Sequence, residues 1–311
     1  MKKKIIPLLI STSFVLAACG QAASTDGTTT TNQTTPAEVQ EEPPVAVSDT
    51  VDTDENFVAS VITELPDSFD ETLYTKEEVK ARVDAIDKEC TNLKAEFKNI
   101  EALTDYYDTY MQEDLGQTDL NIYSGMRFNI WDYEMDSLLA RINDNNIDSL
   151  EPDQKTWEAK SKEVYDVVSQ KEGSISPMVN NGIASSMLRN RCYYLASVLA
   201  DKNGESFDIP ERIAIGEAYY GDNGILYVDY GMEGESITVE YTNTKGETTS
   251  ILAYDPVIDD TTITFEGEDT SDYETPASGK ITYGWNGATL SITDSSINGL
   301  DKGEITFDNA L

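Results

Sequence analysis

The chain has 311 residues, of which 58 are acidic and 22 are basic, and its formal net charge is −36. This excess of negative charge makes nucleic acid a poor partner, because phosphate groups are repelled. The sequence contains no histidine, which excludes a Ser-His-Asp or Cys-His catalytic set and a histidine-ligated zinc site. No carboxylate pair stands out as catalytic, so we expect a protein that is not an enzyme and that uses no cofactor and no metal ion.

Residues 1–18 have the pattern of a lipoprotein signal peptide. Three lysines precede an apolar segment from Ile5 to Leu16, which is followed by two alanines and Cys19. This apolar segment is shorter than the roughly 20 residues that a transmembrane helix needs. We therefore expect Cys19 to carry a lipid that anchors the protein to the cell membrane, on the extracytoplasmic side.

Residues 19–57 are predicted to form a disordered tether. The segment is rich in Thr, Pro, Glu, Gln, Asp and Ala, as in "TDGTTTTNQTTPAEVQEEPP". Such a composition cannot bury enough apolar surface to offset the entropy cost of ordering the chain. The tether would hold the remainder of the protein a short distance from the membrane.

A single long helix is predicted over residues 75–103. Thr75 opens a capping box with Glu78, and apolar residues then recur in steps of three and four along one side. This seam consists of Val79, Val83, Ile86, Cys90, Leu93, Phe97, Ile100 and Leu103.

Three further helices are predicted within residues 58–204. The second helix carries "QTDLNIYSGM" and ends before the polar segment "NDNNIDS". The third begins at Pro152, a residue favoured at the first position of a helix. The fourth begins at Ser176 and Pro177 and ends at Gly204. Four helices with short connections predict an up-and-down bundle.

The segment between the second and third helices has some of the spacing of a calcium-binding loop. Asp144, Asn146 and Asp148 stand at alternate positions, but Ser149 and Lys155 replace the Gly and Glu that such a loop uses. We interpret the segment as a turn between helices.

Residues 205–311 are predicted to form an antiparallel β-sandwich or small barrel of six to eight strands. Short runs such as "ILYVDYG", "TTITFEG" and "GEITF" are separated by turn residues. "TNTKGET" and "WNGA" are typical of hairpin turns, and the pair Asn286-Gly287 suits a type I′ turn. The expected fold class is therefore α+β, with a helical domain followed by a β domain.

Three short motifs in the helical part together resemble the lysozyme inhibitor LprI-type domain. They are "QTDLNIY" in the second helix, "LEPDQKTW" at the start of the third and "RCYYL" in the fourth. The resemblance covers roughly residues 75–202. The positions that match the family pattern are Leu120, Asn121, Tyr123, Leu150, Gln154, Trp157, Arg191 and Leu195.

This resemblance implies a binding protein that inhibits a cationic c-type lysozyme or another muralytic enzyme. Acidic side chains would steer the encounter, and occlusion of the enzyme's cleft would stop hydrolysis. A helical domain can also keep its packing motif without the inhibitory surface. The alternative is a non-inhibitory scaffold of the cell envelope, or a lipoprotein whose β domain binds a peptide, a glycan or a small molecule.

Two details stay open at the level of sequence. Asn121 either bonds across the bundle to Gln154 or to the indole of Trp157, or it points to solvent. Cys90 and Cys192 lie on apolar seams, so we expect both to be buried, either joined in a disulfide between neighbouring helices or as free thiols.

Overall fold

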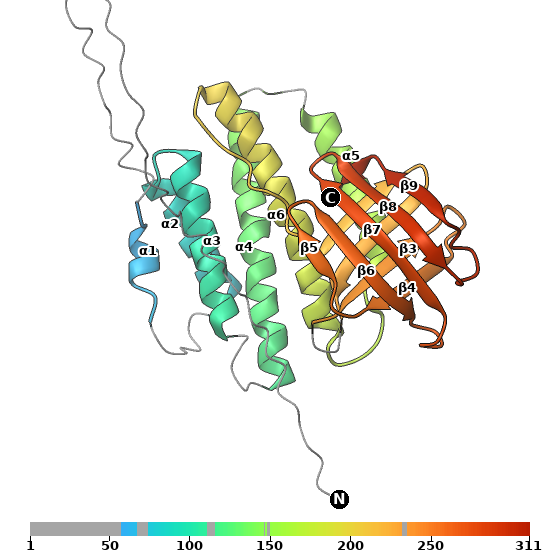
Figure 1. The fold of residues 1–311 in the computed structure, drawn as a ribbon. Coiled ribbons are helices and arrows are strands. Elements are labelled where there is room, and N and C mark those ends of the chain that lie inside the picture. Colours follow the sequence, from blue (N-terminus) through green and yellow to red (C-terminus); the bar gives the residue numbers. More distant parts are fainter. Residues whose placement is uncertain (1–56, 67–73, 111–115, 146, 148–149, 232–234) are drawn as a thin grey trace, which may run out of the picture. The chain divides into compact units, whose positions relative to one another are not determined.

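The computed structural model describes residues 57–66, 74–110, 116–145, 147, 150–231 and 235–311. The expected signal peptide with Cys19, and the expected tether up to residue 56, lie outside the described residues. Within the described part the fold is α+β, with six helices followed by an antiparallel sheet of ten strands (Figure 1). No described helix is long and apolar enough to cross a membrane.

The helices precede all of the strands in the chain. Their bounds are α1 Ser60–Thr63, α2 Lys76–Glu89, α3 Leu93–Tyr110, α4 Gln117–Asp144, α5 Leu150–Val168 and α6 Ser176–Asn203. The two longest, α4 and α6, make the most extensive contact between helices, and α2 and α3 pack against α4. The four-helix count is therefore wrong for the described residues, because they contain six helices.

The predicted helix over residues 75–103 is in fact two helices, α2 and α3. The backbone of Cys90 is extended, with φ −74° and ψ 141°. The side chain of Asn92 then accepts a hydrogen bond from the backbone N–H of Ala95 at 2.8 Å, which is the geometry of a helix N-cap. Asn92 therefore starts a new helix where the apolar spacing alone predicts a continuous one.

Several predicted helix ends are confirmed. The hydroxyl of Thr75 accepts from the N–H of Glu78 at 3.1 Å, and α6 begins at Ser176 with Pro177 in its first turn. Gly204 ends α6 in the left-handed conformation, with φ 74°, which glycine adopts without steric cost. The third predicted helix, α5, begins at Leu150, two residues before Pro152. Asn146, Asp148 and Ser149 of the predicted turn lie outside the described residues.

One apolar core holds the helices together. It includes the predicted seam of α2 and α3 except Cys90, which lies at its edge, together with Tyr123, Ile130, Trp131 and Leu138 of α4 and Leu195 and Leu199 of α6. The seam residues thus point to the same core on both sides of the helix break. Burial of apolar surface of this kind is the main favourable contribution to folding.

The strands form one continuous antiparallel sheet. Their bounds are β1 Glu217–Gly221, β2 Gly224–Tyr230, β3 Ile237–Thr242, β4 Thr248–Ala253, β5 Val257–Asp259, β6 Thr262–Asp269, β7 Pro276–Gly284, β8 Gly287–Ser295, β9 Gly303–Phe307 and β10 Asn309–Ala310. The order is β10-β1-β2-β3-β4-β6-β7-β8-β9, and β5 pairs with β6. The described residues therefore have ten strands in a single sheet, where six to eight strands in a sandwich or barrel were predicted.

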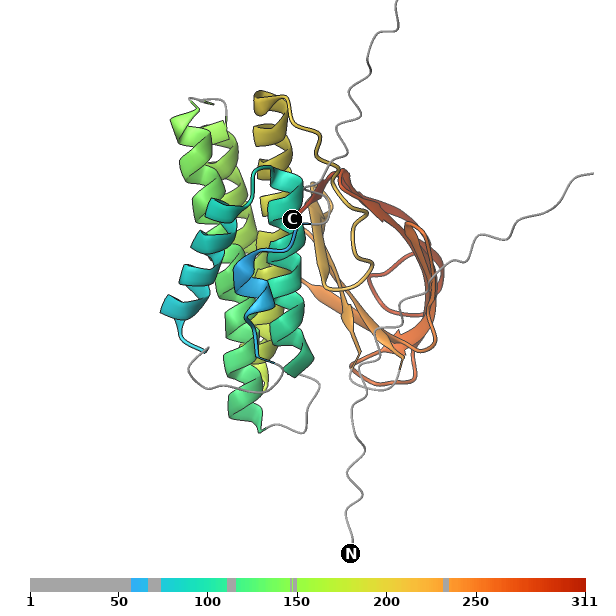
Figure 2. The same cartoon turned by 90° about the vertical axis from the view of Figure 1, so that its left-hand side faces the viewer.

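The two end strands of this order are neighbours in the sequence. β9 ends at Phe307 and β10 begins at Asn309, so Asp308 alone separates them. Because β9 pairs with β8 while β10 pairs with β1, the sheet must curl to bring its two ends together. This curvature is visible in Figure 2.

The hairpin at "WNGA" is confirmed, but its turn is shifted by one residue. Gly284 pairs with Gly287, so Trp285 and Asn286 occupy the turn and Gly287 already belongs to β8. Gly287 has φ 125°, and a Cβ at this position would lie 2.0 Å from the backbone oxygen of Phe307. The glycine is therefore required by the close approach of β9, and the predicted type I′ turn at Asn286-Gly287 is wrong.

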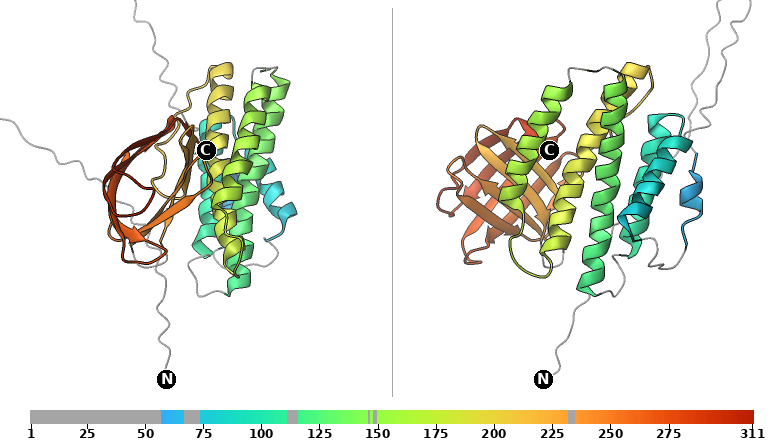
Figure 3. Two further views of the ribbon diagram at one scale, coloured as in Figure 1. Left: turned by 90° about the vertical axis from the view of Figure 1, so that its right-hand side faces the viewer. Right: turned by 180° about the vertical axis from the view of Figure 1, so that it is seen from behind.

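The helices α5 and α6 pack against strands β1 and β2, near one end of the strand order. Val164 of α5 and Met187 of α6 share a cluster of buried residues with Ala218 of β1 and with Ile225 and Tyr227 of β2. Figure 3 shows α5 beside the sheet. Residues Asp54–Leu311 accordingly form one compact unit, in which the helical and β parts share buried apolar surface.

Candidate functional site

Three of the motif residues meet around Arg191 of α6. Its Nε donates to Oε1 of Gln154 at 2.8 Å, and one terminal nitrogen donates to the carboxylate of Asp153 at 2.6 Å. The guanidinium carbon lies 5.5 Å from the ring centroid of Trp157 and 4.8 Å from that of Tyr194. Motif residues that are far apart in the sequence are therefore in direct contact.

The cluster around Arg191 satisfies a buried cation and joins two helices. Arg191 is only 6% exposed, and a buried guanidinium needs both a counter-charge and hydrogen-bond acceptors. Asp153 and Gln154 supply these from α5, and the stacking of the cation on Trp157 adds a cation–π contact. The cluster thus fixes α5 against α6.

The other motif residues lie mainly in the core. Tyr123, Leu150 and Leu195 are buried in the helical core, and Leu120 is partly buried. Their spacing in the sequence is explained by packing alone.

The expected bond from Asn121 to Gln154 or Trp157 is wrong. The Oδ1 of Asn121 accepts from Nε2 of Gln117 at 3.0 Å, and its Nδ2 donates to the backbone oxygen of Ser174 at 3.3 Å. Asn121 is partly buried and links the start of α4 to the segment that precedes α6. Gln154 is instead engaged with Arg191.

Cys90 and Cys192, the cysteines among the described residues, are both free thiols. Cys192 is fully buried on α6, and its thiol donates to the backbone oxygen of Trp131 at 3.4 Å. Cys90 is only half-buried at the end of α2, and burial together with the charge of nearby Glu96 raises the pKa of its thiol to about 12. Of the two alternatives left open by the sequence, the structure has the free thiols, and full burial holds for Cys192 alone.

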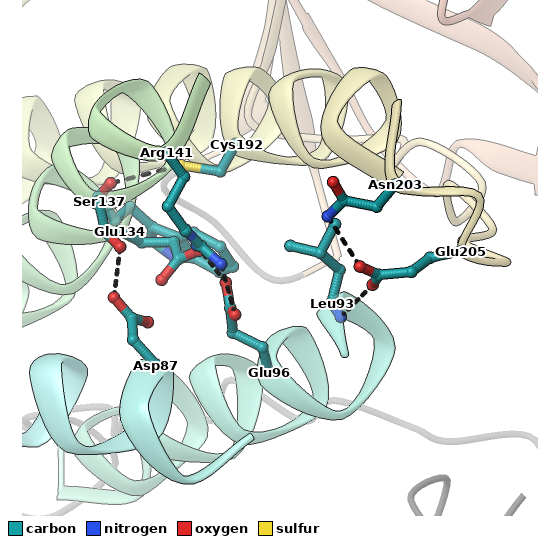
Figure 4. A network of polar contacts seen from close by, with 10 residues as sticks. Asp87, Leu93, Glu96, Glu134, Ser137, Arg141, Cys192, Asn203 and Glu205 are labelled. Atoms are coloured by element: carbon teal, nitrogen blue, oxygen red, sulfur yellow. Dashed lines mark hydrogen bonds and ion pairs between the residues drawn. The ribbon is translucent and has the colours of Figure 1, made fainter. Parts of the chain in front are cut away.

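A cluster of charged residues, which the sequence analysis did not find, lies beneath the break between α2 and α3. Asp87 of α2, Glu96 of α3, and Glu134 and Arg141 of α4 point toward one another (Figure 4). Arg141 donates to both oxygens of Glu96, at 2.6 and 2.8 Å, and lies 3.6 Å from Glu134. Ser137 donates to Oδ2 of Asp87. We call Asp87, Glu96 and Glu134 the acidic cluster.

Glu134 is the most unusual member of the acidic cluster. Its side chain has no exposed surface, and neither of its carboxylate oxygens has a hydrogen-bond partner among the described residues. Burial raises the pKa of Glu134 well above its ordinary value, and the charges of Glu96 and Asp87 raise it further. Burial, followed by the charge of Glu96, likewise raises the pKa of Asp87.

One sequence signal could have revealed Glu134. It lies four residues after Ile130 and four residues before Leu138, and both of these residues are buried in the core. A carboxylate at this helical spacing must point into the core together with them. Glu96 has the same signal, because it lies three residues after Leu93 and four before Ile100, which are both buried in the core. That the carboxylates of Asp87, Glu96 and Glu134 meet has no such signal, because it depends on how three helices pack.

Two surface pockets accompany these clusters. A pocket of about 130 Å³ borders the acidic cluster and is lined by residues that include Asp87, Cys90, Glu96 and Arg141. A larger pocket of about 330 Å³ lies between α5 and the sheet, lined by Lys160, Glu163, Val164, Val167, Tyr220, Gly221, Gly224, Ile225, Thr242, Asn243, Thr244 and Gly246.

Comparisons of the chain with protein-family models, with curated proteins and with solved structures found no match. What bears on function is therefore the chemistry of the residues themselves: the acidic composition, the contacts of Arg191 and the acidic cluster.

Proposed function

We propose that the protein is a membrane-anchored, extracytoplasmic binding lipoprotein whose helical part is of the LprI type and inhibits lysozyme by protein–protein contact. The observation that supports this most directly is the contact of Arg191 with Gln154 and Trp157. This contact brings together residues from two of the three sequence segments that carry the resemblance, which supports the interpretation that these segments pack as one unit. The lipid on Cys19 would keep this unit at the membrane.

The surface above Arg191 has the composition of a contact for a cationic protein. The side chain of Asp153 is 45% exposed, the side chain of Tyr194 is 38% exposed, and Glu158 is exposed on the same helix as Asp153. Tyrosine is enriched at the centres of interfaces, and carboxylates speed the approach of a cationic partner. In this proposal, binding occludes the cleft of the lysozyme, and the protein itself catalyses no reaction.

We also infer that the curled sheet is a small barrel.

Inhibition by the lipid-free protein from residue 57 tests this proposal. We expect micromolar protein to slow the lysis of cell walls by a cationic c-type lysozyme more than polyglutamate of equal total charge does. Tyr194→Ala should weaken inhibition by at least about tenfold, as expected for an interface hot spot. Tyr273→Ala is the matched control, because Tyr273 is 57% exposed and lies between β6 and β7 of the sheet.

Three results would contradict the proposal. The first is no inhibition by the unaltered protein, and the second is inhibition that polyglutamate reproduces, since that would be bulk electrostatics. The third is an equal loss of inhibition in the Tyr194 and Tyr273 variants, because the contact surface would then not lie above Arg191.

The pocket between α5 and the sheet supports a second candidate function, the binding of a small molecule, a glycan or a peptide. Its volume of about 330 Å³ is at the lower end of the range for small-ligand sites. The side chain of Lys160 lies 5.9 Å from the ring centroid of Tyr220 at this pocket. A ligand that raises the melting temperature of the protein, but not that of a Val167→Arg variant with the pocket filled, would support this alternative.

A further inference from the structure

The acidic cluster has the geometry of a cation site. Asp87, Glu96 and Glu134 each offer one carboxylate oxygen, and these three oxygens all lie within 4.8 Å of one another. Oxygen ligands bind Ca²⁺ at 2.3–2.6 Å, so two ligands on one ion are separated by no more than about 5 Å. The three oxygens therefore fit around a single ion of this size without movement of the helices.

Arg141 donates to both oxygens of Glu96, but several oxygens of Asp87 and Glu134 accept no hydrogen bond from the part of the chain that the structure describes. Ser137 occupies Oδ2 of Asp87, whereas Oδ1 of Asp87 and both oxygens of Glu134 are buried without a hydrogen-bond partner among the described residues. Leaving a buried charged group unsatisfied costs more than leaving a neutral one unsatisfied. Glu134 has one positive partner, Arg141 at 3.6 Å, and these oxygens leave room for a second.

The charges of the site point to a divalent ion. Three carboxylates face one guanidinium, that of Arg141, so two negative charges remain uncompensated when all four groups are ionised. Arg141 holds both oxygens of Glu96 and thereby orients this carboxylate toward the other two. One divalent cation would balance the remaining charge.

We propose that Asp87, Glu96 and Glu134 bind a hard divalent cation of the size of Ca²⁺. Carboxylate oxygens are typical ligands of Ca²⁺, Mg²⁺ and Mn²⁺, whereas Zn²⁺ favours nitrogen and sulfur. The pocket of about 130 Å³ beside Asp87 and Glu96 gives the ion a route from solvent and room for water ligands. The site is independent of the proposed lysozyme contact.

The bound cation would join three helices. Its ligands come from α2, α3 and α4, and two of them lie on either side of the helix break at Cys90. A ligand that binds only the folded state raises the melting temperature. For a protein of this size we expect a rise of roughly 5 to 10 °C at a hundredfold excess over the dissociation constant.

The test measures the melting temperature and calcium binding of the metal-stripped protein from residue 57. CaCl₂, MgCl₂, MnCl₂ and ZnCl₂ are added separately at constant ionic strength, and calcium binding is measured by calorimetry. We expect Ca²⁺ to bind one site and to raise the melting temperature. Glu134→Gln should abolish both effects without lowering the melting temperature in the absence of metal, since it removes a buried charge but keeps the side-chain shape.

Asp136→Asn is the matched control, because Asp136 is exposed on the same helix and the change in charge is the same. It should keep calcium binding and the rise in melting temperature. If Glu134→Gln does not fold, Asp87→Asn takes its place and should also lose binding.

Three outcomes would overturn the proposal. In the first, none of the hard cations binds or stabilises the unaltered protein, so that protons alone balance the cluster. In the second, the Glu134 and Asp136 variants respond equally, which places binding elsewhere on the acidic surface. In the third, only Zn²⁺ binds and Cys90→Ser abolishes its binding.

Discussion

Asn190 of α6 donates a hydrogen bond from Nδ2 to the carboxylate of Glu217 in β1, at 2.7 Å. The same carboxylate pairs with Arg212, and each side chain of this ion pair is only 1% exposed. Asn190 and Arg212 also donate to the backbone oxygen of Leu311. The carboxylate of Glu217 thus connects α6 to β1, and the two donors that it shares with Leu311 also hold the residue that follows β10.

Glu217→Gln is expected to destabilise the protein strongly. The substitution keeps the side-chain shape but leaves the charge of Arg212 buried without its partner, which typically costs about 3–5 kcal/mol. Urea unfolding measures the loss. Glu304→Gln in β9 is the control, since Glu304 is exposed and should change the free energy of unfolding by less than about 0.5 kcal/mol. Equal stabilities of the two variants would contradict the importance of the buried pair.

Arg191→Lys is expected to lower the free energy of unfolding by about 1–3 kcal/mol. Lysine keeps the charge, but it cannot donate to Gln154 and Asp153 in the fork geometry of arginine or stack in the same way on Trp157. The same unfolding experiment measures the effect. Lys162→Ala removes an exposed pair with Asp166 and should leave the free energy of unfolding nearly unchanged. If Arg191→Lys changes the free energy of unfolding as little as Lys162→Ala does, the contacts of Arg191 do not fix α5 against α6.

The two free thiols should differ in reactivity. In the native protein without reductant, a polar alkylating reagent should label Cys90 slowly and Cys192 only after unfolding. The pKa of Cys90 is about 12, so at pH 8 its thiolate fraction is on the order of a thousandfold below that of an ordinary cysteine. Labelling should speed up about tenfold for each unit of pH. A mass two daltons lower without reductant would instead reveal a disulfide.

The free energy of unfolding should fall as the pH rises from about 4 to 6, because the carboxyl of Asp108 loses its proton in this range. Burial raises the pKa of this carboxyl to about 6, although Arg127 at 3.0 Å opposes the shift. Because the folded state then binds the proton more tightly than the unfolded state, deprotonation favours unfolding. The expected loss is about 1–2 kcal/mol, since the side chain is a third exposed and solvent weakens the effect.

Comparison of unfolding curves across this pH range tests the contribution of Asp108. Asp108→Asn should flatten the dependence on pH relative to the unaltered protein, whereas Asp136→Asn should leave it unchanged. If the Asp108 variant keeps the full slope, the loss belongs to other carboxyls.

The sequence predicts the features that depend on neighbours along the chain. The apolar spacing from Val79 to Leu103 identifies core residues correctly, and Thr75 and Gly204 mark two helix ends. The break before Leu93 was missed because apolar periodicity continues across it. Asn92 carries the local signal for the break, as a helix-capping residue within a run that otherwise reads as helix.

The features that depend on packing between helices were not predictable in this way. The helical spacing of Glu134 marks it as a core position, but in a chain with 58 acidic residues nothing in the sequence pairs it with Asp87 and Glu96, and only the folded structure brings the three together. The partner of Asn121 was predicted wrongly for the same reason, because Gln154 bonds to Arg191 from another helix. Gln154, Trp157 and Arg191 lie far apart in the sequence, and their contacts with one another appear only in the folded structure.

The curled sheet also has a consequence for self-association. An open sheet exposes unpaired backbone groups on its outermost strands, and such edges promote edge-to-edge aggregation. Here Asn223, in the turn between β1 and β2, donates a side-chain hydrogen bond to the backbone oxygen of Thr306 in β9 at 2.9 Å, and Asn309 of β10 donates to that of Tyr220 at 3.4 Å. The side chain of Asn223 thus covers a backbone oxygen of the outermost strand β9, where a foreign strand would have to pair, whereas Asn309 reinforces the pairing of β10 with β1. The strand β5 pairs with β6 alone and exposes Val257 and Ile258. Because it has only three residues, it is too short to pair stably with a strand of another molecule.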